Sequence, residues 1–165
     1  MPAGYWARRE DVSVGPSALK GVLSIPDDTR GLVIVADVNP DEDHSRCNAR
    51  SAAALHSRRW STLLLDLAFQ RNDTHHARAV SNECFSARVV EAVLWVARQE
   101  RIAKLQIGLL GADGGSPAVL AAAAEVPRLV STVVCCDGKP DLAGRELAYV
   151  QVPTLLVMGE LNAAG

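Results

Sequence analysis

The residue in this chain best placed to do chemistry is an aspartate at the centre of a glycine-rich turn. Residues 105–110 form an apolar run, residues 111–115 have the spacing Gly-x-Asp-x-Gly, and an alanine-rich helical stretch follows. This pattern predicts a strand, a sharp turn and a helix, with Asp113 at the apex, where such turns present a nucleophile. An aspartate there can attack a substrate and form an ester that an activated water then hydrolyses. The alternative is that Asp113 caps the following helix, which favours an aspartate by about 1 kcal/mol.

Aspartates also stand at or near the ends of four successive predicted strands. The carboxyl ends of parallel strands meet at one edge of a sheet, where ligands bind. Carboxylates that converge there repel one another unless one is protonated or a hard cation joins them. A Mg²⁺ or Ca²⁺ site is therefore one expectation, with the ligands Asp37, Asp41, Asp66, Asp113 and Asp137. The alternative is that these aspartates form turns and caps that face water.

Alternating apolar and amphipathic segments are expected to position these residues. Hydrophobic periodicity predicts strands over 12–14, 19–25, 31–36, 61–67, 105–110, 130–136 and 154–158, and helices over 46–59, 82–101 and 117–125. The first two strands are expected to form a hairpin at the sheet edge. The pattern predicts one α/β domain over residues 1–165, a three-layer sandwich of a mostly parallel sheet with helices on both faces.

Several segments in this order resemble one family. They are the turn at 111–115 and the stretches 19–26, 31–36, 63–67, 139–144 and 153–162. From Val12 to Asn162 the chain resembles the dienelactone-hydrolase-like branch of the α/β-hydrolases. The resemblance implies a truncated α/β-hydrolase fold that lacks the final strand and helix. It also implies an ancestry in the hydrolysis of small carboxylic esters or lactones.

The catalytic parts that the resemblance implies all differ here from the family pattern. Asp113 stands in place of the serine or cysteine nucleophile, and Asn162 stands at the position of the triad acid. The histidine base would follow a further strand, but no histidine occurs after His76. The oxyanion loop, usually opened by His-Gly, opens here with Asp37 and contains His44, which is a speculative base. We therefore expect a hydrolase-family protein without ordinary serine-hydrolase activity. A non-catalytic binding or assembly module and a cation-dependent activity at the aspartates are the alternatives, so whether the protein is an enzyme stays open.

Composition narrows the remaining function classes. A net charge of −2 gives no electrostatic case for binding nucleic acid or an anionic membrane. No signal peptide and no run of about 20 apolar residues is evident. The four cysteines lack Cys-x-x-Cys spacing, as in a reduced cytoplasmic protein. No cofactor beyond Mg²⁺ or Ca²⁺ is expected. The apolar strand over 154–158, as a sheet edge, predicts a homodimer or other homo-oligomer, or else a larger protein of which this chain is a part.

Overall fold

Seven strands, three α-helices and one 3₁₀ helix make up the part of the chain that the structure describes. The structure is a computed structural model that describes residues 8–38, 42–68 and 81–159, and of residues 42–45 the backbone alone. The strands are β1 (Arg8–Val14), β2 (Leu19–Ile25), β3 (Leu32–Asp37), β4 (Ser61–Asp66), β5 (Ile107–Ala112), β6 (Val130–Cys136) and β7 (Thr154–Val157). The helices are α1 (Glu42–His56), α2 (Asn82–Arg98), α3 (Gly115–Glu125) and the 3₁₀ helix η1 (Pro140–Tyr149).

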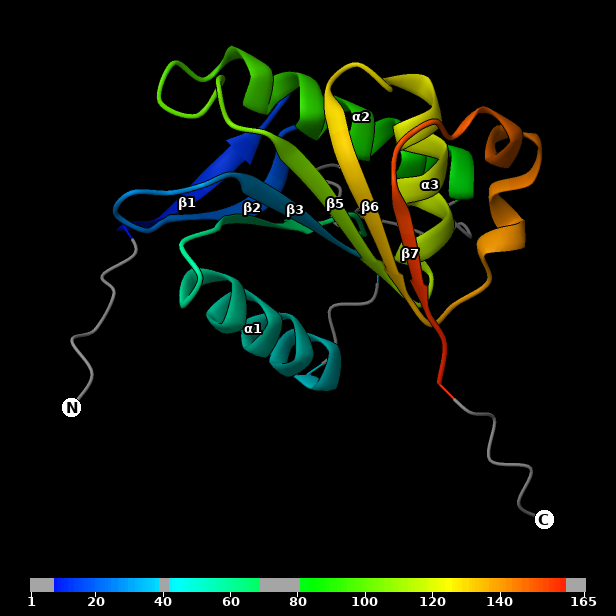
Figure 1. Cartoon of the computed structure of the whole chain (residues 1–165), viewed down its shortest axis with the longest axis horizontal. Coiled ribbons are helices and arrows are strands. Elements are labelled where there is room, and N and C mark those ends of the chain that lie inside the picture. The colour runs from blue at the N-terminus through cyan, green and yellow to red at the C-terminus, as the bar shows by residue number, and fades with distance from the viewer. Residues whose placement is uncertain (1–7, 39–41, 69–80, 160–165) are drawn as a thin grey trace, which may run out of the picture.

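The strands form a single twisted sheet in the order β1-β2-β4-β3-β5-β6-β7. Strands β1 and β2 form an antiparallel hairpin, and β2 also pairs antiparallel with β4. The pairs β4–β3, β3–β5, β5–β6 and β6–β7 are all parallel. Helix α1 lies on one face of the sheet, whereas α2 and α3 lie on the other (Figure 1). The predicted three-layer α/β fold, with the hairpin at one edge, is therefore confirmed.

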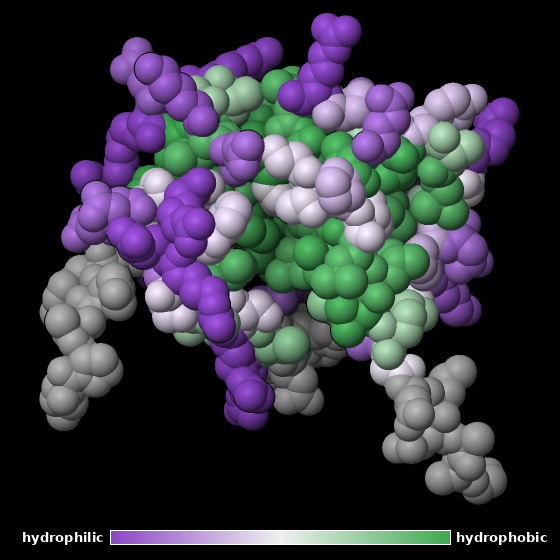
Figure 2. Space-filling model, in the orientation of Figure 1, coloured by the Kyte–Doolittle hydropathy of each residue, from purple (hydrophilic) through white to green (hydrophobic). Residues whose placement is uncertain are grey.

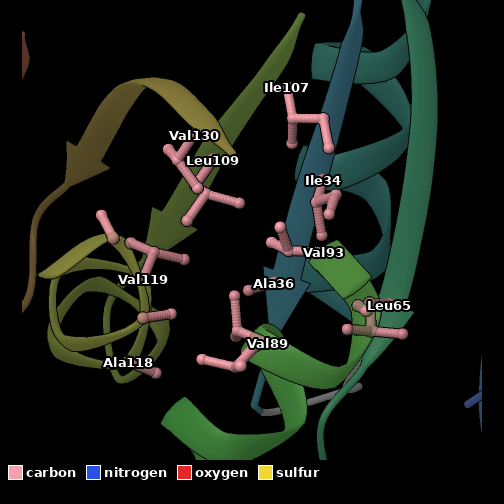
Figure 3. Close-up of a cluster of buried hydrophobic side chains, with 14 of the residues drawn as sticks. Ile34, Ala36, Leu65, Val89, Val93, Ile107, Leu109, Ala118, Val119 and Val130 are labelled. Carbon is pink, nitrogen blue, oxygen red and sulfur yellow. The ribbon is translucent and has the colours of Figure 1, made fainter. Parts of the chain in front are cut away.

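The hydrophobic core lies between the sheet and the α2–α3 layer. Ile34 of β3 and Leu109 of β5 lie in one cluster with Val89 and Val93 of α2 and Val119 of α3 (Figure 3). All five side chains are at most 1% exposed. Each such burial contributes about 1.5–3 kcal/mol to folding. This layer holds β3 and β5 rigidly side by side, and these strands carry Asp37 and Asp113 at their ends.

The structure shifts several predicted boundaries by a few residues. Strand β5 begins at Ile107 instead of residue 105, because Leu105 closes a turn by donating its N–H to the carbonyl of Ile102 at 3.0 Å. Helix α3 begins at Gly115, two residues before the predicted start. The turn expected over 139–144 is longer and becomes the 3₁₀ helix η1, in which Gly144 adopts a φ of 64°.

No helix in the described ranges is long and apolar enough to cross a membrane.

Candidate functional site

Asp113 lies at the apex of the predicted strand–turn–helix, which the structure confirms. Strand β5 ends at Ala112 and α3 begins at Gly115, and between them Asp113 adopts a left-handed φ of 46°. Its N–H donates to the carbonyl of Cys136 at 3.0 Å, and its carbonyl accepts from the N–H of Ser116 at 3.1 Å. A non-glycine residue in this conformation costs about 1–2 kcal/mol. The strained apex presents an exposed side chain, as a nucleophile elbow does.

Glycines flank Asp113 because the turn is too tight for any side chain there. A Cβ atom on Gly111 would lie 2.6 Å from the carbonyl oxygen of Gly115 and 2.7 Å from Cγ2 of Val119. A Cβ atom on Gly115 would lie 2.6 Å from the carbonyl oxygen of Ala36 in β3. Distances below 3.0 Å are essentially never seen for a real Cβ atom. The first turn of α3 therefore sits directly on the ends of β3 and β5.

The assigned helix start does not place Asp113 at the N-cap position of α3. The N-cap position is Gly114, which makes no side-chain capping bond. The Val38 side chain packs against Gly114, since a Cβ on that glycine would lie 2.7 Å from Cγ2 of Val38. In elbow enzymes the N–H of the residue after the nucleophile helps to bind the oxyanion. Here an apolar side chain from the loop after β3 lies beside that residue.

The four strand-end aspartates occupy the predicted edge of the sheet. Asp37 and Asp66 end β3 and β4, and Asp113 and Asp137 directly follow β5 and β6. The carboxylate of Asp37 accepts a hydrogen bond of 2.6 Å from Nδ2 of Asn48 in α1. The carboxylate of Asp66 accepts one of 2.9 Å from the N–H of Ala68. Both bonds are of the kind expected for aspartates that shape turns and fix neighbouring elements.

Asp137 connects the carboxyl ends of β6 and β7. Its Oδ1 accepts a hydrogen bond of 2.7 Å from the N–H of Gly159. Its carbonyl accepts one of 2.9 Å from the hydroxyl of Ser116, which is fully buried in the first turn of α3. Asp137 itself has a left-handed φ of 57°. These contacts tie the elbow to the last strand of the sheet.

No three His, Cys, Asp or Glu residues in the described ranges form a group that could hold a metal ion. Asp41, one of the five expected ligands, lies outside the described residues. The Mg²⁺ or Ca²⁺ site therefore stays a prediction that the geometry around Asp37, Asp66, Asp113 and Asp137 does not strengthen.

The side chains that the structure describes include neither the candidate base nor the candidate acid of Asp113. His44 lies in the first turn of α1, where the backbone alone is described, and Asn162 lies outside the described residues. His56 is in the last turn of α1, and its Nε2 lies 2.8 Å from the hydroxyl of Thr62. Thr62 stands four residues, or about 13 Å, before the carboxyl end of β4. Burial lowers the pKa of His56, so this distant imidazole favours its neutral form.

Two cysteines at the end of β6 lie next to the elbow, but neither is an activated nucleophile. The side chain of Cys135 is buried against α3, whereas that of Cys136 points to the other face and is half-buried, which confirms that neighbours on this strand face apart. Burial raises the pKa of both thiols. The nearby carboxylate of Asp137 and the thiol of Cys47 raise the pKa of Cys136 further. A raised pKa disfavours the thiolate, which is the reactive form.

A buried arginine near the site was not predicted. Arg88 of α2 is 4% exposed, and its guanidinium donates to the carbonyl of Leu67, just beyond the end of β4. The sequence does not predict the burial of Arg88, because a single arginine in an amphipathic helix usually faces solvent. Its position next to Val89, at the centre of the buried stripe of α2, was the available signal.

A cavity of about 990 Å³ separates α1 from the hairpin side of the sheet. Its apolar walls are Val22, Val35 and Leu64 of the sheet together with small alanines of α1, and charged residues of β1 and β2 line its rim. The cavity includes Asp37 and Asp66 but not Asp113. The elbow and this cavity are therefore separate features of the molecule.

Comparison with known proteins places the fold and the family. The crystal structure of dienelactone hydrolase from Anabaena variabilis matches 93% of this chain and 74% of its own chain, with a TM-score of 0.83 and 34% identity. This chain belongs to the dienelactone-hydrolase-like α/β-hydrolases. XC6422 from Xanthomonas campestris, described as an α/β serine hydrolase without a lid, has the same fold at a TM-score of 0.68, with 19% identity over 95% of this chain and 72% of its own. No protein-family model matches the chain.

Curated relatives of this family member carry a different name. Two proteins of Mycobacterium tuberculosis, one in each of two strains, are named "Putative phosphoribosyl transferase". Each is 36% identical over 154 residues, which cover 92% of this chain. This chain spans about a third of the length of these relatives, since the matched region covers 35% of them.

Proposed function

We propose that this member of the dienelactone-hydrolase family does not carry out serine-type or cysteine-type hydrolysis and that its fold serves binding or assembly. The observation that carries the proposal is Asp113 at the strained apex of the elbow. Serine-type and cysteine-type hydrolysis need a hydroxyl or thiol there that a base can deprotonate, together with donors for the oxyanion. A carboxylate at the apex instead places a negative charge next to the place where the oxyanion of the substrate would develop.

The surroundings of Asp113 support the same proposal. The side chain of Val38 packs against Gly114, whose N–H would serve the oxyanion. Asp137, the nearest aspartate along the sheet edge, accepts a bond from the Gly159 N–H and fixes the end of β7. His56, the one histidine whose side chain the structure describes, bonds Thr62 away from the carboxyl edge. On this proposal Val38 and Asp137 serve the architecture of the elbow, and His56 joins α1 to β4 away from it.

Phosphoribosyl transfer is not the activity we propose for this chain. The relatives that carry that name are almost three times as long as the matched region, and this chain has the fold of an α/β-hydrolase. We assign the named activity of those proteins to the part that has no counterpart here. On this proposal the matched region of each relative is a hydrolase-like module in a longer protein.

Labelling with a fluorophosphonate probe tests the proposal. The probe reacts covalently with an activated serine, and intact-mass measurement counts the adducts. We expect no adduct on the wild-type protein, and none on Asp113→Ser, because the serine introduced at the apex finds no base. Circular dichroism of each protein checks that the fold is retained. An adduct on wild type, or on Asp113→Ser at position 113, would show an activated site and would contradict the proposal.

A further inference from the structure

Helix α1 is held over the sheet at two places, with only small side chains between them on the side of the hairpin. Asn48 donates to Asp37 at the carboxyl edge of the sheet. His56 bonds Thr62, which lies four residues, or about 13 Å, before the end of β4. Between these two bonds the helix lines the cavity of about 990 Å³ with three alanines, Ala49, Ala52 and Ala53. Their methyl groups are too short to fill the space between α1 and the hairpin.

The floor of this cavity is an apolar row of the sheet. Strand register places Val22 of β2, Leu64 of β4 and Val35 of β3 side by side. Val22 and Leu64 are only half-buried, although they lie in the middle of their strands. Hydrophilic side chains gather on the side of the hairpin and α1 in Figure 2, so this apolar floor lies behind a polar rim. The volume is in the range of small-molecule sites, and the floor suits the apolar body of a ligand.

One end of the cavity gathers groups that can hold a negative charge. The next row on the same face of the sheet consists of Arg9 of β1, Ser24 of β2 and Thr62 of β4. His56 of α1 lies over Thr62. Arg9, Ser24 and His56 all line the cavity. A guanidinium, a hydroxyl and an imidazole can each donate a hydrogen bond, so together they favour an oxyanion.

The opposite end of the cavity carries charges that match one another. Lys20 of β2 and Asp66 of β4 lie opposite each other, because the antiparallel register pairs Gly21 with Leu65. The carboxylate of Asp37 accepts the hydrogen bond from α1 described above. This end therefore offers a ligand less unmatched charge than the end at Arg9.

Asp11 is the remaining carboxylate of the described lining. It lies two residues beyond Arg9 on β1 and is exposed, in one row with Val22 and Leu64. A cationic ligand at Asp11 would meet one carboxylate between apolar neighbours. An anionic ligand at Arg9 would meet a guanidinium beside further donors, so the lining favours an anion over a cation.

We propose that this cavity binds an elongated aliphatic carboxylate, of the kind of a medium-chain fatty acid. The carboxylate lies at Arg9 and Ser24, and the alkyl chain runs over the apolar row toward the carboxyl edge of the sheet. This inference rests on the binding role proposed above and names its ligand. Because Asp113 does not line the cavity, ligand binding and the inactivity of the elbow can be tested separately.

Calorimetric titration with decanoate, below the concentration at which it forms micelles, tests the proposal. We expect one saturable site on the wild-type protein and the same affinity in Asp113→Ala. Ala52→Leu takes up space that the alkyl chain needs, so it should weaken binding about tenfold or more. Ala54→Leu, at an exposed alanine of α1 outside the described lining, is the matched control and should bind like wild type.

Charge variants test where the carboxylate lies. Arg9→Gln should weaken decanoate binding about two- to five-fold, as expected for an exposed ion pair. Arg8→Gln is the control, because neighbours on a strand point to opposite faces, and it should leave the affinity unchanged. Asp11→Asn removes a like charge and should tighten binding slightly. Decyltrimethylammonium, a cation with the same alkyl chain, should bind more weakly than decanoate.

Nuclear magnetic resonance on the wild-type protein gives a second measurement that needs no variant. Decanoate should shift the amide signals of Val22, Ala52 and Leu64 more than that of Val119, which lies on the other side of the sheet. Absence of saturable binding would overturn the proposal, as would unchanged affinity in both Ala52→Leu and Arg9→Gln, or tighter binding of the cation. An adduct of the fluorophosphonate probe together with decanoate binding would contradict the inactivity of the elbow alone.

Discussion

The tightness of the elbow predicts that Gly111→Ala destabilises the protein. The added methyl group would lie 2.6 Å from the carbonyl oxygen of Gly115 and 2.7 Å from Cγ2 of Val119. The backbone oxygen cannot turn away, so β5 and α3 must separate by several tenths of an ångström. Overpacking of this kind costs about 1–3 kcal/mol. For a chain of this size about 2 kcal/mol lowers the melting temperature by about 4–8 °C.

Gly108→Ala is the matched control, because it makes the same change in the same strand. Its methyl group would meet the Cγ2 of Thr132 at 3.3 Å, so the neighbour need give by only a few tenths of an ångström. Removing a glycine also lowers the entropy of the unfolded chain, which offsets part of any strain. Gly108→Ala should therefore stay within about 1 kcal/mol of wild type. Urea unfolding followed by circular dichroism measures both variants, and equal stability of the two would refute the close packing described for the elbow.

Two further predictions concern stability. Arg88→Met should lower the free energy of unfolding by about 2–3 kcal/mol, because it leaves the carbonyl of Leu67 without its charged donor. The control is Arg98→Met, at an exposed arginine of the same helix, which should change this free energy by less than about 0.5 kcal/mol. Similar losses in the two variants would contradict this account. For His56, burial lowers the pKa in the folded state, so below its ordinary value of 6.5 the unfolded chain binds the proton more readily. The stabilising effect is present above pH 6.5 and is lost as the pH falls below it. Urea unfolding between about pH 8 and about pH 5 should show a smaller loss of stability in His56→Gln than in wild type, and an unchanged pH dependence would show that His56 is not the group responsible.

The layered fold could be predicted because its signals are local and repeated. The apolar run 31–36 marks a strand buried on both faces, and Val89, Val93 and Val96 mark the inner stripe of α2. The elbow could also be predicted, since Gly111 and Gly115 are required by a backbone approach that any side chain would block. Short-range steric rules fix all of these features.

Features that depend on distant contacts could not be read from the sequence. The bond from Asn48 to Asp37 and the contact between His56 and Thr62 attach the middle and the last turn of α1 to the sheet, and each joins residues on separate elements. The burial of Arg88 depends on the position of Leu67, just beyond the end of β4. The exact start of α3 also depends on the turn, which places Gly114 and not Asp113 at the N-cap position.

The most direct test of the central claim is a hydrolysis assay of wild type, Asp113→Ala and Asp113→Ser on p-nitrophenyl esters, lactones and epoxides. The account predicts that all three proteins leave the esters, the lactones and the epoxides at the background rate, because no base activates the apex residue or a water beside it. Turnover by wild type that disappears in Asp113→Ala would contradict the account. It would make Asp113 a covalent nucleophile of a working enzyme.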